Sequence, residues 1–211
     1  MNRPEPPFYA NRDDDKSCSL AVYRSLIEKF TGKSVDWAYV ENLTGFQPRI
    51  AAWTVKALTD LTKEGWDIKV FEPFDYNVYL SEGESYLKAQ FGEEIADWQI
   101  KNSNVLEMKQ YIPEFLKKVN ITVKNPSIED IEDMIDEGRL VSLVLNSKAL
   151  NNQPGYVGHS VLIFDFDDDN LKFHDPGLPG VKSRIEKKEL VLMAMGKASD
   201  ATGFKLSDQI K

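Results

Sequence analysis

The chain has 211 residues, of which 42% are hydrophobic and 28% are charged, and 34 acidic residues against 26 basic ones give it a formal net charge of −8. This length and composition are typical of a globular protein that can bury a sizeable core, and they argue against two large independent domains. Because the phosphate backbone of nucleic acids and anionic membranes are also negatively charged, we expect neither as a partner.

Cys18 is the only cysteine of the chain, which excludes an intramolecular disulfide and a metal site built from several thiolates. The sequence has no apolar run of about 18 residues and no signal-peptide pattern within roughly its first 25 residues. It also has no glycine-rich phosphate-binding loop of either common type. We therefore expect a cytoplasmic protein without a metal or a cofactor.

The first half of the chain is predicted to be mainly helical. Residues 1–16 should form an extended arm, because prolines disfavour a helix there, and Phe8 and Tyr9 can dock the arm on the body. Ser17 is the expected N-cap of a helix over residues 18–31. Apolar spacing predicts further helices over residues 36–43, 49–64, 84–101 and 105–119, and alternation predicts a strand over residues 66–71.

The second half is predicted to be mainly β. We expect strands from residue 121 and over residues 140–145, 157–166 and 170–174, a closing edge strand over 203–206, and helices over 128–137 and 186–195. The expected fold class is α+β: one domain over residues 1–211, in which a helical half (17–120) packs on a mainly β half (121–211) with an antiparallel sheet.

Cys18 is a candidate nucleophile. A single cysteine with a histidine far downstream is a recognised pattern for thiol catalysis. The first turn of a helix favours the thiolate, because unpaired backbone N–H groups and the positive end of the helix dipole lie there. The alternative is a small buried apolar residue without chemistry.

His159 and Asp175 are the candidate partners of Cys18. If an acidic turn near residue 167 closes an antiparallel hairpin, residues whose numbers sum to about 334 lie opposite one another and point to the same face of the sheet. Residues 159 and 175 meet this condition. Asp175 is therefore predicted to hold one imidazole nitrogen of His159, which leaves the other nitrogen to take the proton of Cys18.

The segments Phe8 to Cys18, Gly155 to His159 and His174 to Gly177 resemble the C39-like branch of the papain-like cysteine peptidases, and the resemblance covers most of the chain. It implies a papain-like fold in which the cysteine opens the first long helix and the histidine and aspartate lie on neighbouring strands. It also implies Cys18 as nucleophile, His159 as general base and acid, and Asp175 as the orienting residue. The implied partner is a peptide or a small substrate that contains an amide.

Two residues depart from the family pattern. Arg12 stands six positions before the cysteine, where the family carries a glutamine of the oxyanion hole, and Ser19 follows the cysteine where bacteriocin-processing relatives usually carry glycine. Arg12 is expected to donate to an oxyanion or to bind a substrate carboxylate. The departures keep one alternative open, a catalytically decayed peptide-binding module. A second alternative is an acyl or γ-glutamyl transferase, which would use the same three residues with a different acceptor. The sequence does not indicate an oligomeric state.

His174 is the only other histidine, and we expect a structural role for it on the sheet face opposite to Asp175. The acidic residues around position 167 lack the glycine and the glutamate that a calcium-binding loop requires, so a solvated turn is the preferred interpretation.

Overall fold

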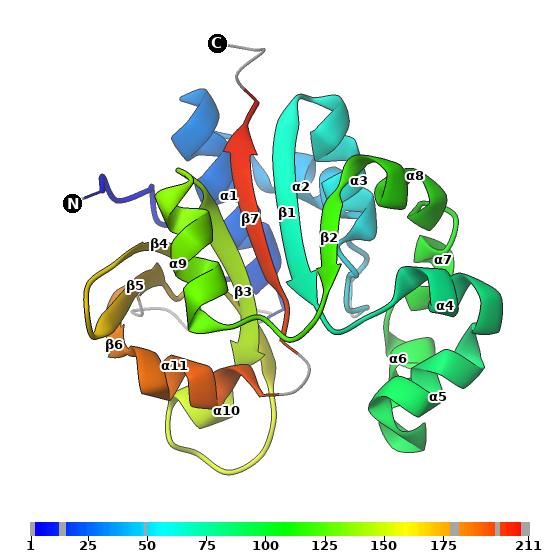
Figure 1. The fold of residues 1–211 in the computed structure, drawn as a ribbon. Coiled ribbons are helices and arrows are strands. Elements are labelled where there is room, and N and C mark those ends of the chain that lie inside the picture. The colour runs from blue at the N-terminus through cyan, green and yellow to red at the C-terminus, as the bar shows by residue number, and fades with distance from the viewer. Residues whose placement is uncertain (1–2, 13–15, 49, 178–181, 197–198, 208–211) are drawn as a thin grey trace.

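A mixed sheet of seven strands, in the order β2-β1-β7-β3-β4-β5-β6, lies at the centre of the computed structural model (Figure 1). The structure describes residues 3–12, 16–48, 50–177, 182–196 and 199–207. The strands are β1 (Trp66–Glu72), β2 (Asn120–Val123), β3 (Leu140–Asn146), β4 (Gly158–Phe166), β5 (Asn170–His174), β6 (Ser183–Lys187) and β7 (Ala201–Leu206). Strands β1 and β2 pair in parallel, whereas the other neighbours pair antiparallel.

The predicted α+β class is confirmed, with two corrections to the sheet. The sheet is mixed and not purely antiparallel, because β1 and β2 pair in parallel. The segment over 203–206 was expected to be an edge strand, but β7 lies inside the sheet between β1 and β3. The reason is that β1, which belongs to the helical half, joins the sheet and covers the outer side of β7. The edges are β2 and β6.

The helices are α1 (Cys18–Thr31), α2 (Trp37–Thr44), α3 (Val55–Lys63), α4 (Tyr76–Glu82), α5 (Glu84–Phe91), α6 (Glu93–Asn102), α7 (Val105–Met108), α8 (Ile112–Lys118), α9 (Ile128–Asp136), α10 (Ser147–Leu150) and α11 (Lys188–Met195). In the part of the chain that the structure describes, none of the helices is long and apolar enough to cross a lipid bilayer.

Helix α1 has the predicted bounds, but several other boundaries differ from the prediction. The expected helix over 84–101 is two helices, because Gly92 adopts a left-handed φ of 82° between α5 and α6. The expected helix over 105–119 also divides into two, with a proline in the first turn of α8. The helix expected over 49–64 begins only at Val55, and residue 49, like residues 13–15 of the predicted arm, lies outside the described residues.

Helices cover both faces of the sheet (Figure 1). On β4, Leu162 and Phe164 belong to the apolar cluster that includes residues of α1 and α3. Val161 and Ile163, which alternate with them, belong to the cluster that includes residues of α9 and α11. The middle of β4 is therefore packed from both sides, and α1 (Cys18–Thr31) contacts this strand.

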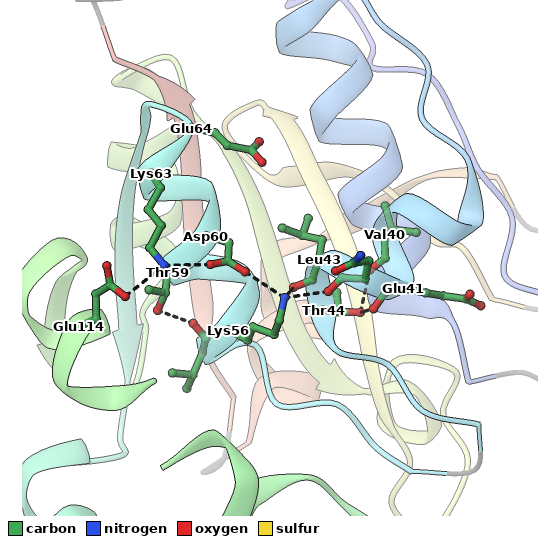
Figure 2. Close-up of polar contacts among 12 residues, drawn as sticks. Val40, Glu41, Leu43, Thr44, Lys56, Thr59, Asp60, Lys63, Glu64 and Glu114 are labelled. Carbon is green, nitrogen blue, oxygen red and sulfur yellow. Dashed lines mark hydrogen bonds and ion pairs between the residues drawn. The ribbon is translucent and has the colours of Figure 1, made fainter. Parts of the chain in front are cut away.

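A chain of charged contacts ties α3 to two other helices (Figure 2). The Lys56 ammonium donates to the carbonyl oxygens of Asn42 and Leu43, at 2.8 and 3.2 Å, and to Asp60 at 2.9 Å. Lys63 continues the chain from Asp60 to Glu114 of α8. Lys56 thus satisfies carbonyl groups in the last turn of α2, where the helix dipole favours a cation.

Candidate active site

Cys18 is the first residue of α1 and is partly exposed. Ser17 occupies the N-cap position as expected, but its side chain makes no capping hydrogen bond. Its hydroxyl instead accepts a hydrogen bond from Arg12 Nε at 2.7 Å. The cysteine therefore lies at the N-terminus of a helix of 14 residues, where helical N–H groups lack intrahelical acceptors.

His159 is the second residue of β4, and its imidazole lies close enough to the Cys18 thiol for each group to shift the pKa of the other. Burial raises the pKa of the Cys18 thiol, but the hydrogen bond and positive charge of His159, with the backbone N–H groups of Ser160 and Ser19, outweigh burial and lower the pKa below its usual value. Burial lowers the pKa of His159, and the hydrogen bonds to Asp175 and Cys18 reverse this and raise it. Both shifts favour a thiolate–imidazolium pair.

Asp175 follows the last residue of β5, and its Oδ1 lies 2.7 Å from His159 Nε2. The predicted contact is present, although the predicted register is wrong. His174 pairs with Leu162, so the strands are displaced by two residues from the expected alignment. Burial raises the pKa of the Asp175 carboxyl, whereas hydrogen bonds from His159, the Gly177 N–H and Arg184 lower it to about 2.

Arg184, on β6, is a neighbour of the site that the sequence analysis did not identify. Its Nη1 lies 3.0 Å from Asp175 Oδ2 and 3.1 Å from Asn151 Oδ1, and its Nη2 lies 2.9 Å from Glu186. A strand with one exposed apolar residue, Ile185, gives little periodic signal, so β6 itself was not predicted.

Asn11 is a second neighbour that the sequence analysis did not identify. It is buried, and its Oδ1 accepts hydrogen bonds from the backbone N–H groups of Arg12 and Ser17 at 2.9 and 2.8 Å. Its own N–H donates to the carbonyl oxygen of Pro176 at 2.6 Å. Asn11 therefore joins the residue before Cys18 to the residue after Asp175.

The side chain of Arg12 contacts α2 and the residue Phe46 that follows it. Its Nη1 is hydrogen-bonded to Glu41, and the centre of its guanidinium lies 5.1 Å from the ring centroids of both Trp37 and Phe46. The expected role of Arg12 at an oxyanion or a substrate carboxylate stays a prediction.

His174 lies against the N-terminal arm, as expected for a structural residue. Its Nε2 is 2.8 Å from the carbonyl oxygen of Pro6, and its ring makes edge-on contact with Phe8. Burial lowers the pKa of His174. Among the described residues, no group of three or more His, Cys, Asp or Glu side chains is arranged to hold a metal ion.

The carboxylates of Asp200 and Glu72 interact on the side of β3 away from His159, because β3 lies between β4 and β7. Asp200, at the start of β7, accepts a hydrogen bond at its carbonyl from the N–H of Val144, the neighbour of the residue that pairs with His159. Burial raises the pKa of Asp200 to about 7, and burial together with the charge of Asp200 raises the pKa of Glu72.

The chain is similar to the crystal structure of the peptidase domain of Streptococcus ComA, a bi-functional ABC transporter involved in a quorum sensing pathway. The TM-score is 0.52 and the sequence identity 12%, and the similarity covers 97% of this chain and 100% of that chain. No protein-family model matches the sequence, and no curated protein matches it. The structural similarity confirms the expected fold, because the ComA peptidase domain has the same arrangement of helices around a sheet.

Proposed function

We propose that the protein is a cysteine peptidase or amide hydrolase that acts through Cys18, His159 and Asp175. The observation that carries this proposal is that His159 interacts with both other side chains: its Nε2 lies 2.7 Å from Asp175 Oδ1, and its imidazole lowers the pKa of the Cys18 thiol. A base that lies between the nucleophile and the group that orients the base is the arrangement that activates a thiol. The fold supports the proposal, and the substrate we propose is a peptide or a small molecule with an amide bond.

The proposed reaction begins with attack of the Cys18 thiolate on the carbonyl carbon of the amide. The C–N bond breaks as the His159 imidazolium gives its proton to the leaving amine, and a thioester remains on Cys18. Water then attacks the thioester while His159 accepts its proton, which releases the acid and restores the thiol pair. Asp175 accepts the hydrogen bond of Nε2 throughout, so that Nδ1 stays directed at the sulfur.

The oxyanion of the tetrahedral intermediate needs hydrogen-bond donors. The backbone N–H of Cys18, in the first turn of α1, is the proposed main-chain donor, and Arg12 is the proposed side-chain donor. Losing one such donor typically costs on the order of 10²- to 10³-fold in turnover. The turnover of Arg12→Met against wild type measures the contribution of this side chain.

The rate of Cys18 alkylation by iodoacetamide, followed by mass spectrometry as a function of pH, tests the proposal. Because Cys18 is the only thiol, the modified mass reports on one site. We expect fast labelling that persists below pH ~7 in the wild type and is lost in His159→Ala, because the thiolate depends on the imidazolium. Slow labelling with an ordinary thiol pKa near 8.5 in both proteins would contradict the proposal and support a peptide-binding module.

A second measurement separates catalysis from reactivity of the thiol. A peptide mixture incubated with wild type should show cleavage or transfer products that are absent with Cys18→Ala. Products that persist with Cys18→Ala would contradict the proposed nucleophile. Addition of an amine acceptor tells hydrolysis from acyl or γ-glutamyl transfer, because both start from the same thioester.

A further inference from the structure

Arg184 makes contacts that the proposed reaction does not yet use. Its side chain is 18% exposed, and its Nη1 donates to Asp175 Oδ2 at 3.0 Å and to Asn151 Oδ1 at 3.1 Å. The Nε and Nη2 atoms donate to the carboxylate of Glu186 at 3.1 and 2.9 Å. Three of its nitrogen atoms are thus anchored, which fixes the plane of the guanidinium.

The two oxygen atoms of Asp175 have different partners. Oδ1 accepts from His159 Nε2 at 2.7 Å and from the Gly177 N–H at 3.0 Å, whereas Oδ2 accepts from Arg184. A carboxylate held at both oxygen atoms cannot rotate about its Cβ–Cγ bond without breaking hydrogen bonds to charged groups, which are the stronger class of hydrogen bond. The orientation of Oδ1 toward His159 therefore depends on the contact at Oδ2.

We propose that Arg184 is a positioning residue of the reaction, which holds the Asp175 carboxylate so that one oxygen faces His159. This inference rests on the proposed function, since it assigns Arg184 to the Cys18–His159–Asp175 site. Arg184 acts through Asp175 and touches neither the thiol nor the proposed substrate. It also binds Asn151, and so connects Asp175 to the segment that leads into β4 and His159.

Arg184 could act on His159 through its charge or by positioning the Asp175 carboxylate. These two effects predict opposite shifts of the His159 pKa when Arg184 is removed. The charged and titratable groups that face one another here are Cys18 of α1, His159 of β4, Asp175, and Arg184 and Glu186 of β6. If Arg184 acted through its charge alone, its removal would leave the Asp175 charge uncompensated and raise the pKa of His159. If Arg184 positions the carboxylate, its removal weakens the His159–Asp175 hydrogen bond and lowers this pKa.

The experiment titrates the two histidines by NMR in a Cys18→Ala background, which removes the coupled titration of the thiol. The proteins compared are this background alone and with Arg184→Met, Arg184→Lys or Glu186→Gln. We expect Arg184→Met to lower the pKa of His159 by about one unit, a tenfold change in its protonation equilibrium. Arg184→Lys keeps a donor and a charge, so its His159 pKa should lie between the values of Arg184→Met and the background. Glu186→Gln should lower the His159 pKa much less than Arg184→Met does.

His174 is the second probe: its imidazole contacts Pro6, Phe8 and the Ser183 hydroxyl rather than Asp175, so its pKa should change much less than that of His159. Thermal unfolding of each variant establishes that the fold is intact, and Arg184→Lys supplies the comparison if Arg184→Met does not fold. An unchanged or raised pKa of His159 in Arg184→Met, or in Arg184→Lys if only that variant folds, would overturn the inference.

The same variants in the protein that retains Cys18 separate this inference from the proposed function. If the function holds, the pH at which iodoacetamide labelling begins should move upward in Arg184→Met, because a weaker imidazolium stabilises the thiolate less. If wild-type Cys18 has an ordinary thiol pKa, the proposed function fails, yet the NMR titration still decides whether Arg184 positions Asp175.

Discussion

Asp175 lies two residues along the sheet from the position directly opposite His159, yet its Oδ1 is 2.7 Å from His159 Nε2. Leu162 pairs with His174 and Ile163 with Phe173, and the same register extended by one residue places Val161 opposite Asp175. Because side chains alternate between faces with a period of two, a displacement of two residues keeps both side chains on the same face. A diagonal pair is still within reach of long side chains, and the imidazole spans the remaining distance.

The depressed pKa of Asp175 predicts a specific pH dependence of stability. In the unfolded chain the pKa is about 3.9, and in the folded protein it is about 2. The ionised carboxylate therefore stabilises the fold fully above about pH 4, and this contribution is lost as the pH falls toward 2. Urea unfolding of wild type and Asp175→Asn should show a difference in the free energy of unfolding that is largest above pH ~4 and narrows below it. A difference that stays constant over this range would contradict the assignment.

Asn11 should control both the stability of the arm and the reactivity of Cys18. Asn11→Leu leaves the N–H groups of Arg12 and Ser17 without their acceptor, which costs about 1 to 3 kcal/mol for a buried donor. The segment before Cys18 is then less well fixed, and iodoacetamide labelling below pH ~7 should slow. Asn11→Asp keeps an acceptor oxygen and is the matched control, with a smaller loss of stability. Wild-type labelling and stability in Asn11→Leu would refute this prediction.

Gly203 should not tolerate a side chain, although its strand is regular. A Cβ added there would lie 2.6 Å from Met134 Sδ and 2.9 Å from Arg139 Cδ. We expect Gly203→Ala to cost about 1 to 3 kcal/mol, as is typical of overpacking. Chemical denaturation checks the value. Because Met134→Ala removes the closest atom, Gly203→Ala should cost less in that background, and a purely additive double mutant would exclude the clash as the cause.

The sequence predicted those elements whose signals are local. Strand β5 (Asn170–His174) and helix α1 (Cys18–Thr31) have the predicted bounds, because an acidic turn and a glycine C-cap mark their ends. The strand order was not predictable in the same way, since the place of β7 depends on pairing with β1, which is far away in the sequence. Pairing of distant strands leaves no local pattern in either segment.

Some residues of the candidate site could likewise be predicted from local sequence signals, and others could not. Cys18, His159 and Asp175 were proposed from residue type, spacing and family resemblance. Asn11 and Arg184 were not, because their partners, Pro176 and Asp175, are brought to them only by the folded sheet and arm. Arg12 was proposed from its position relative to Cys18, and nothing local indicated its contacts with Glu41 and the two aromatic rings.

Lys56 should contribute more to stability than Lys63, although both bind Asp60 (Figure 2). Lys56 is 18% exposed in its side chain and also donates to two carbonyl groups at the end of α2. Lys56→Met should therefore cost about 1 to 2 kcal/mol of stability, the range for a partly buried cation at a helix C-terminus.

Lys63→Met is the matched control. The Lys63 side chain is 47% exposed and bonds only carboxylates in the described contacts. Since pairs between exposed side chains contribute little, urea unfolding should show a clear loss for Lys56→Met and little change for Lys63→Met. Equal losses would mean that the shared Asp60 contact, and not the α2 carbonyl groups, accounts for the effect.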